Sequence, residues 1–238
     1  MNKLQQWIKY KRDLRQFIGL GGRVEKKRPM LREFEGAAGE ASGHYFHQDL
    51  LIAQFIHRNN PFRHIDVGSS IGGFVSHVAS FREIEVFDIR PLKILSHPNI
   101  IFKLADLSKE DFIKGQVTDS LSSLHALEHF GLGRYGDTID PLGHIKGFNN
   151  MLKMVSDGGL MYVSFPISWK AGVHFNAHRV FDPNEIFDWP SQKHQIELVR
   201  FDFVDDLGNL YKDVTTDFVP RSTEYGCGIY TLLKKSFA

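Results

Sequence analysis

The feature that most constrains the fold is a strand-like run that breaks into small residues, "HIDVGSSIGGF" from His64 to Phe74. A parallel strand is buried on both faces, so the acid that it carries, Asp66, needs hydrogen-bond partners. Ligands of open α/β sheets bind at the carboxyl ends of strands, where a turn of small residues lets the backbone approach the ligand. We therefore expect a ligand site here, with Asp66 bonded either to the ligand or to the amides of the turn.

The chain as a whole indicates an α/β fold. Strand-like runs alternate with helical patterns, which is typical of a mostly parallel sheet with helices on both faces. The five strand candidates are "RHIDV", "IEVFDI", "NIIFKLA", "VTDSLSSL" and "LMYVSF". Helices are expected over 44–60, 71–81, 108–114 and 145–155, with a capping box in "SKED" (108–111) and a helix end in "SDGG" (156–159). Two further runs, "IELVRFDFV" and "GIYTLLKK", predict a terminal antiparallel β pair.

Length and composition predict one main domain with a basic N-terminal arm. A chain of 238 residues, 42% of them hydrophobic, can bury one sizeable core. The near balance of 29 basic and 28 acidic residues argues against a nucleic-acid binder. Residues 1–32 nevertheless hold ten lysines and arginines against two acids. We assign 1–44 to a basic helix and linker, and 45–238 to the main domain.

The arm has two alternative interpretations. Its expected helix has apolar residues at positions 4, 7, 8, 14 and 18, which would pack on the main domain as a cover or form a homodimer contact. Alternatively, a basic amphipathic helix suits peripheral contact with an anionic membrane surface. The single cysteine, Cys227, fits a reducing compartment. The sequence also lacks a signal-peptide pattern and an apolar run of about 18–20 residues, so we expect a cytoplasmic protein.

Three acids follow three consecutive strand candidates. Asp88 ends the second strand, 22 residues after Asp66, and Asp106 follows the third strand 18 residues later. A ribose-binding carboxylate is expected about 20 residues past the first acid. Each acid taken alone could be a surface turn residue. Because all three fall at the same edge of the sheet, we interpret them as parts of one ligand site.

Around these acids the sequence resembles the class I S-adenosylmethionine-dependent methyltransferases, over about residues 45–205. "HIDVGSSIGG" is similar to their first motif, acid-x-Gly-x-Gly-x-Gly, and "EVFDIRP" to their second. "KLADLSKE" resembles their adenine-side acidic motif, while "SSLHALEH" and "DGGLMYVSFP" resemble the segments of the fourth and fifth strands. The resemblance implies a Rossmann-like methyltransferase fold that binds S-adenosylmethionine and releases S-adenosylhomocysteine.

The resemblance also implies a cofactor site. Asp66 and the glycine turn would surround the methionine part, Asp88 the ribose, and Asp106 the adenine. The implied residues are Asp66, Gly68, Ser69, Ser70, Gly72, Asp88, Ile89, Asp106, Leu107, Leu124 and His125. Ser70 departs from the family, which usually has glycine there, and adds a side chain beside the cofactor.

Three further stretches point to an acceptor. "HYFHQD", "FGLGRYGD" and "FNAHRVF" resemble a bacterial methyltransferase-like family of unknown function whose members are often associated with surface-polysaccharide synthesis. This resemblance implies methylation of a hydroxyl on a sugar or glycan acceptor.

A hydroxyl acceptor needs a general base, most often a histidine. The histidines after strands four and five are the candidates, with His129 the first choice, Glu128 orienting it, and His174 or His178 as alternatives. The predicted substrate contacts are Tyr135, Asn176, His178 and Arg179. Asp137 and Asp140 could hold a divalent ion, but as turn acids they are better interpreted as solvated, so we expect no metal.

Other functions remain alternatives. A nicotinamide-dependent oxidoreductase would use a similar glycine turn, but Asp66 would then place negative charge near a pyrophosphate. "HALEH" (125–129) matches a zinc-peptidase pattern, but glycines at 131 and 133 leave little room for the continuous helix that a histidine pair needs. A non-catalytic cofactor-binding or partner-binding protein with a degenerate site is the remaining alternative, which Ser70 supports.

Overall fold

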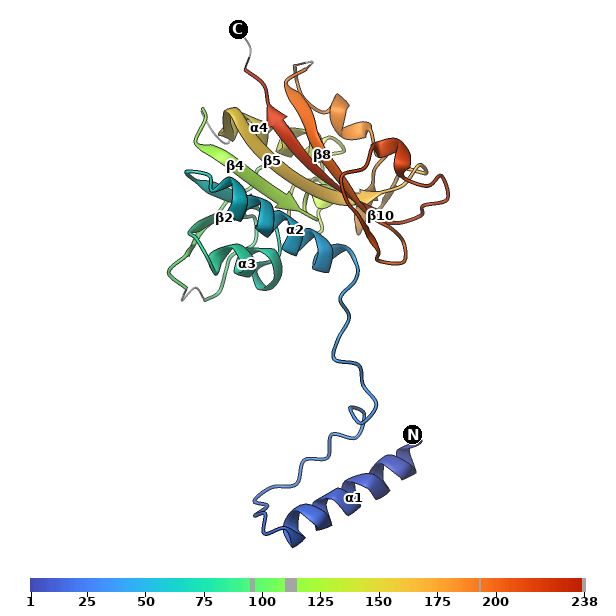
Figure 1. Cartoon of the computed structure of the whole chain (residues 1–238). Coiled ribbons are helices and arrows are strands. Elements are labelled where there is room, and N and C mark those ends of the chain that lie inside the picture. Colours follow the sequence, from blue (N-terminus) through green and yellow to red (C-terminus); the bar gives the residue numbers. More distant parts are fainter. Residues whose placement is uncertain (95–96, 110–114, 193, 237–238) are drawn as a thin grey trace. The chain divides into compact units, whose positions relative to one another are not determined.

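The strand candidates join in one sheet. Within the residues that the computed structural model describes, 1–94, 97–109, 115–192 and 194–236, eight strands form this sheet (Figure 1). In spatial order they are β3 (Ile100–Leu104), β2 (Ile84–Asp88), β1 (His64–Val67), β4 (Thr118–Leu124), β5 (Val155–Ile167), β10 (Gly226–Lys234), β8 (Ile196–Val204) and β9 (Leu210–Tyr211). A separate hairpin consists of β6 (Gly172–His174) and β7 (His178–Val180).

The direction of the strands confirms the predicted fold class. Strands β3, β2, β1, β4 and β5 run parallel to one another. Strand β10 lies antiparallel between β5 and β8, so the predicted terminal antiparallel pair is also present. The chain leaves β1 toward β2 on one side and returns to β4 on the other, and this is the point where open α/β sheets bind ligands.

The helices cover both faces of the sheet. They are α2 (His44–Asn59), η1 (Ile71–Val75), α3 (Ser76–Ala79), η2 (Leu127–His129), α4 (Gly143–Met154), η3 (Glu185–Asp188) and η4 (Thr216–Phe218). In Figure 1, α2 and α3 lie in front of the sheet and α4 behind it. Strand β5 serves both cores, because Met161 and Val163 pack with α4 while Tyr162 packs with α2. This alternation follows from the two-residue period of a strand.

Helix α2 shows how local sequence sets these elements. Its buried residues include Ile52 and Ile56, which lie four apart on one face. The helix ends at Asn59 and is capped by Asn60, which adopts a left-handed conformation (φ 41°) and donates its N–H to the Ile56 carbonyl at 2.9 Å. Pro61 follows and cannot continue the helix.

Several local predictions were wrong. The segment 71–81 is not one regular helix, because Gly73, inside η1, has non-helical angles (φ −102°, ψ −105°) and α3 ends at Ala79. A Cβ at Gly73 would lie 2.6 Å from the Asp49 carboxylate, so a larger residue here would displace that side chain. "SDGG" does not end a helix: α4 ends at Met154, and these residues lie in the first part of β5. Of the helix predicted over 108–114, residues 110–114 lie outside the described residues, as does the second half of its "SKED" box.

The chain divides into two compact units, residues 1–41 and 42–238. The first contains α1 (Lys3–Gly19), which begins with a capping box in which Asn2 and Gln5 each accept the other's backbone N–H at 2.9 Å. No residue of α1 is buried. Among the described residues, no helix is both long and apolar enough to cross a bilayer.

Candidate functional site

A cavity lies at the carboxyl-terminal edge of the sheet, beside the point where the chain returns from β3 to β4. Its volume of about 650 Å³ is within the usual range for small-molecule sites. A narrower cavity of about 50 Å³ adjoins it. Both are lined by Gly68, Asp88, Arg90, His125, His129 and Tyr135. Because of these shared residues we treat the two cavities as one site, with a wide part and a narrow part.

The turn after β1 supplies one wall of the wide part. Gly68 has φ 75°, and a Cβ there would lie 2.9 Å from the Cβ of Ala126, so both conformation and space require glycine. Ser69 and Ser70 also line the wide part. The Ser70 hydroxyl accepts the N–H of Gly73 at 3.2 Å, so this departure from the family's glycine caps the turn that follows it.

Asp66 lies behind this wall and fastens it to the sheet. Its carboxylate accepts hydrogen bonds from the Ser69 hydroxyl (2.6 Å), the Ser69 N–H (3.1 Å) and the Ser122 hydroxyl (2.6 Å). The side chain is fully buried, and burial raises the pKa of Asp66 to about 7, while its bonds with Ser122 and Ser69 act to lower it. Asp66 was expected to bond either to the ligand or to the amides of the turn, and in the structure it bonds to the turn.

Asp88 ends β2 and lines both parts of the site. Its two oxygens accept hydrogen bonds from the Arg90 guanidinium, Oδ1 at 3.0 Å and Oδ2 at 2.7 Å, and Oδ1 also accepts the Arg90 N–H at 2.8 Å. The guanidinium lies 4.3 Å from the centre of the Tyr135 ring. Arg90 thus holds both oxygens that a ribose diol would use.

The third acid lines the narrow part. Asp106 lines it together with Ile89 and Leu107. The Asp106 carboxylate accepts the N–H (3.0 Å) and the hydroxyl (2.5 Å) of Ser108, which holds the turn after β3 in place. This part of the site combines apolar lining residues with an acid held in place by Ser108.

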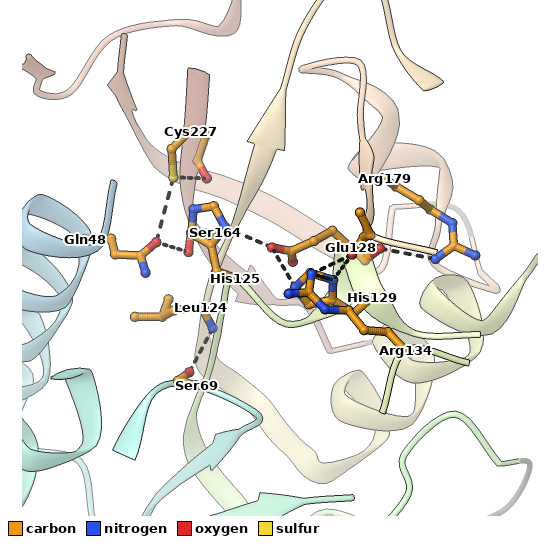
Figure 2. A network of polar contacts seen from close by, with 12 residues as sticks. Gln48, Ser69, Leu124, His125, Glu128, His129, Arg134, Ser164, Arg179 and Cys227 are labelled. Carbon is orange, nitrogen blue, oxygen red and sulfur yellow. Dashed lines mark hydrogen bonds and ion pairs between the residues drawn. The ribbon is translucent and has the colours of Figure 1, made fainter. Parts of the chain in front are cut away.

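Two histidines share one buried carboxylate after β4. Glu128 Oε1 lies 2.8 Å from His125 Nδ1 and 3.7 Å from His129 Nε2. Figure 2 shows the His125 ring between Glu128 and Cys227. Burial acts to lower the pKa of His125, but the neighbouring Cys227 and Glu128, to which His125 Nδ1 is hydrogen-bonded, outweigh burial and raise the pKa well above its usual value. The carboxylate predicted to orient His129 thus bonds more closely to His125.

His129 is oriented by a different group. Its Nδ1 lies 2.8 Å from the Ala177 carbonyl, which can only accept, so Nδ1 carries the proton and Nε2 keeps its lone pair. Arg134 donates to the same carbonyl at 2.7 Å. Burial lowers the pKa of His129, against the charge of Glu128, which raises it. His129 therefore presents a neutral, basic nitrogen beside a carboxylate.

Hydrogen bonds from Asp137 and Arg179 hold the loop between η2 and α4 in place. Asp137 accepts the N–H groups of Gly131 (2.7 Å), Gly133 (3.2 Å) and Tyr135 (3.2 Å). Arg179 is buried and donates to the backbone carbonyls of Phe130 (2.6 Å) and Pro141 (3.2 Å), among others. These bonds fix the wall that carries Tyr135.

Some predicted site residues do not line these two cavities. They are Asp66, Gly72, His174, Asn176 and Arg179. Gly72 and Asn176 are exposed. His174 is exposed on the β6–β7 hairpin, with its Nδ1 3.2 Å from Nε2 of His178, which does line the wide part. Because the Arg179 guanidinium is bonded to loop carbonyls, we assign it to positioning of the loop rather than to substrate contact.

Other residues of the site were missed by sequence reasoning. Tyr45 and Tyr225 line the wide part, and Arg90 and Arg134 bring positive charge to it. Arg90 follows Asp88 by two residues, so the "DIR" sequence offered a signal for that pair. Tyr225 directly precedes β10, and no local pattern indicates that this strand lies beside β5.

One protein family matches part of the sequence. Residues 100–186 match a family described as "Caenorhabditis protein of unknown function, DUF268". No curated protein is significantly similar to the chain.

Comparison with solved structures identifies the fold. The chain is similar to the N-methyltransferase NodS from Bradyrhizobium japonicum WM9 in complex with S-adenosylhomocysteine, with 13% identity, a TM-score of 0.52, and coverage of 92% of this chain and 98% of NodS. It is similar to the 1,6-didemethyltoxoflavin-N1-methyltransferase of Burkholderia thailandensis, with 14% identity, a TM-score of 0.52, and coverage of 79% of both chains. It is also similar to the [4+2]-cyclase SpnF, with 13% identity, a TM-score of 0.56, and coverage of 79% and 82%. The chain therefore has the Rossmann-like class I methyltransferase fold.

The buried carboxylate of Asp66 gives a test of this part of the site. Its pKa is about 7 in the folded protein and about 3.9 in the unfolded chain, so its contribution to stability is full below pH 3.9 and is lost as pH rises to 7. Asparagine does not titrate. We expect the free energy of unfolding of the wild type, relative to Asp66→Asn, to fall by up to about 1.4 kcal/mol per pH unit between these values and then to level off. Urea unfolding of both proteins at several pH values measures this pH dependence.

The exposed Asp217 provides the matched control for that experiment. The difference between wild type and Asp217→Asn should show no comparable slope over the same range. A pH-independent difference for Asp66→Asn would contradict the raised pKa.

Proposed function

We propose that this protein is an S-adenosylmethionine-dependent methyltransferase that methylates a hydroxyl group. The observation that carries the proposal is the single site at the edge of β1, β2 and β4, which combines a glycine turn, Asp88, Asp106 and a neutral histidine. In the proposed arrangement the narrow part holds the adenine and the turn after β1 holds the methionine part. The acceptor occupies the wide part.

The reaction is an in-line displacement. The acceptor oxygen forms a bond to the methyl carbon as the bond from that carbon to the sulfonium breaks, and S-adenosylhomocysteine leaves. His129 Nε2 takes the hydroxyl proton, because its lone pair is free and the Glu128 carboxylate 3.7 Å away stabilises the imidazolium that forms. The protein's main contributions are alignment and the exclusion of water.

We propose a sugar or glycan as the acceptor. Three tyrosines, Tyr45, Tyr135 and Tyr225, line the wide part together with His178 and Arg134. Aromatic rings offer flat apolar faces with a polar tip, which suits a ligand that has both C–H surfaces and hydroxyls. The resemblance of "FGLGRYGD" and "FNAHRVF" to a family associated with surface polysaccharides supports the same class. A precursor of such a polysaccharide, made in the cytoplasm, is the acceptor that we favour.

A non-catalytic cofactor-binding or partner-binding protein is the second candidate. The observation that favours it is Arg90, which holds both oxygens of Asp88. Calorimetric titration with S-adenosylmethionine and S-adenosylhomocysteine separates the two candidates, since an inability to bind either ligand would contradict the enzyme. Titration with nicotinamide dinucleotides tests the oxidoreductase, which the charge of Asp66 does not exclude because Asp66 does not line the site.

Asp88 tests the identity of the cofactor. Asp88→Ala removes the acceptor of the ribose hydroxyls, so we expect S-adenosylmethionine to bind about 1.5–3 kcal/mol more weakly, the range for hydrogen bonds to charged groups. Isothermal titration calorimetry measures the change. Asp217→Ala, which alters an exposed acid that does not line the cavities, should leave affinity unchanged. Unaltered affinity in a folded Asp88→Ala protein would refute the ribose contact.

His129 tests the proposed catalysis. Once a panel of sugars and sugar nucleotides has yielded an acceptor, His129→Ala should lower turnover by roughly 10²–10⁴ because no base takes the proton. Release of S-adenosylhomocysteine measures turnover, and calorimetry should show nearly unchanged cofactor affinity. His174→Ala serves as the comparison, because this histidine is exposed and does not line the cavities. A loss of only a few-fold in His129→Ala would move the role to His178.

The basic arm is tested by deletion of residues 1–20. If α1 is a cover or a dimer contact, we expect the truncated protein to melt at a lower temperature or to change its oligomeric state, without liposome binding before or after the deletion. Each basic residue near an anionic membrane contributes about 1 kcal/mol, and this attraction is screened by salt. Pelleting of the full chain with anionic liposomes at low salt, but not at high salt, would assign the arm to the membrane instead.

A further inference from the structure

Three potential metal ligands meet beside the wide part of the site. Among the described residues, His44 on α2, His125 after β4 and Cys227 on β10 form a group whose ligand atoms all lie within 4.8 Å of one another. Cys227 is fully buried, and the side chain of His125 is 3% exposed. The His44 and His125 rings are stacked, with their centres 5.2 Å apart.

The nitrogen of His125 that faces this group lacks a partner. Its Nδ1 is bonded to Glu128, while its buried Nε2 has no hydrogen-bond partner among the described residues. Figure 2 shows this side of the ring directed toward Cys227. A buried polar nitrogen without a partner costs free energy, so its presence calls for an explanation. A cation between Nε2 and the sulfur would provide one.

Both histidines are oriented as metal ligands usually are. Metal-binding histidines typically bond their second ring nitrogen to a carboxylate or a backbone carbonyl. His125 does so with Glu128 at 2.8 Å, and the His44 ring forms a hydrogen bond with the backbone of Tyr225.

The cysteine is only weakly engaged elsewhere. Its thiol is 3.8 Å from the Gln48 side-chain oxygen and 3.7 Å from the Gly228 carbonyl, which are long contacts for a weak donor. If a metal replaced the thiol proton, only these two weak hydrogen bonds would therefore be lost. The Gln48 oxygen keeps its bond from the Ser164 hydroxyl at 2.6 Å.

We propose that His44, His125 and Cys227 form a zinc site, with Glu128 as the group that orients His125. Two imidazoles and a thiolate suit Zn²⁺, which takes four ligands in a tetrahedron at about 2.0–2.3 Å. That geometry separates ligand atoms by roughly 3.4 Å, so side-chain movements of about 1 Å close the site. Three protein ligands leave the fourth position for water or a substrate atom. Because His125 and Tyr225 line the wide part, this position adjoins the proposed acceptor.

This site is distinct from the zinc-peptidase pattern in "HALEH". That pattern would use His125 and His129 together, from one face of a helix. Here η2 spans only Leu127–His129, and the two histidines lie on either side of Glu128. The ligand set combines His125 with residues that are 81 positions before it and 102 positions after it.

The test uses the full chain and cobalt as a probe. Protein freed of metal by a chelator is titrated with Co²⁺, whose absorption reports tetrahedral ligands and, in the near ultraviolet, a thiolate bond. Because Cys227 is the only cysteine of the chain, a thiolate band can arise from this residue alone. We expect one Co²⁺ per chain with that band, its displacement by Zn²⁺, and zinc in the protein as purified. Copper in its place, or no stoichiometric metal, would overturn the zinc assignment.

Variants then assign the ligands. Cys227→Ser should abolish the thiolate band, and His44→Gln should weaken metal binding by at least about 100-fold. Glu128→Gln should keep the band and weaken binding by roughly 10–100-fold, as expected for a group that orients a ligand. His57→Ala alters an exposed histidine on the same helix as His44 and should change nothing.

Two measurements keep the result interpretable. Circular dichroism of each metal-free variant shows whether it folds, and the partly buried His44 remains informative if Cys227→Ser does not. Metal affinity unchanged in a folded His44→Gln protein would refute the site. The site does not depend on methyl transfer, because calorimetry with S-adenosylmethionine on the metal-free and zinc-loaded protein tests the two proposals separately.

Discussion

The buried carboxylate of Asp66 is the interaction on which the rest of the site depends. It joins β1 to β4 through Ser122 and to the glycine turn through Ser69, whose hydroxyl in turn accepts the N–H of Leu124 at 2.9 Å. Burial of an acid is unfavourable, and the pKa of about 7 reflects this cost after the hydrogen bonds have offset part of it. In exchange, one side chain sets the relative positions of the turn and the end of β4. Removal of the carboxylate would loosen both walls of the cavity at once.

The end of β4 in turn positions the two histidines that follow it. His125 follows Leu124 with a left-handed backbone (φ 50°), which turns the chain so that Glu128 and His129 fall beside the cavity. Glu128 then acts on both rings, because it bonds to His125 and lies near the free nitrogen of His129. The proposed base and the proposed metal ligand are thus coupled through one carboxylate. A change of charge at His125 would alter how strongly Glu128 stabilises an imidazolium at His129.

The sequence predicted the elements well and the contacts between distant elements poorly. Five strands, α2 and α4 follow from hydrophobic patterns and end signals, which are local properties. The kink at Gly73 was missed, and so was the close approach of Asp49, which comes from α2 and is a contact between distant parts of the sequence. The three acids were found at the strand ends, but their partners differ: Asp66 and Asp106 bond to nearby serines, whereas Asp88 holds Arg90. The meeting of His44, His125 and Cys227 depends on β10 lying beside β5, which no spacing reveals.

Arg90 holds the acid that the proposed cofactor would use. The same fold supports N-methyltransferases and a [4+2]-cyclase among its structural relatives, so activity depends on the cavity and not on the sheet. A ribose that uses Asp88 must replace two guanidinium bonds, and the freed Arg90 would keep its contact with Tyr135 on the acceptor side. Cofactor binding would then change the charge next to the ring that we assign to the acceptor. In the proposed arrangement, the ribose would compete with Arg90 for Asp88, and release of Arg90 would couple cofactor binding to the acceptor part of the site.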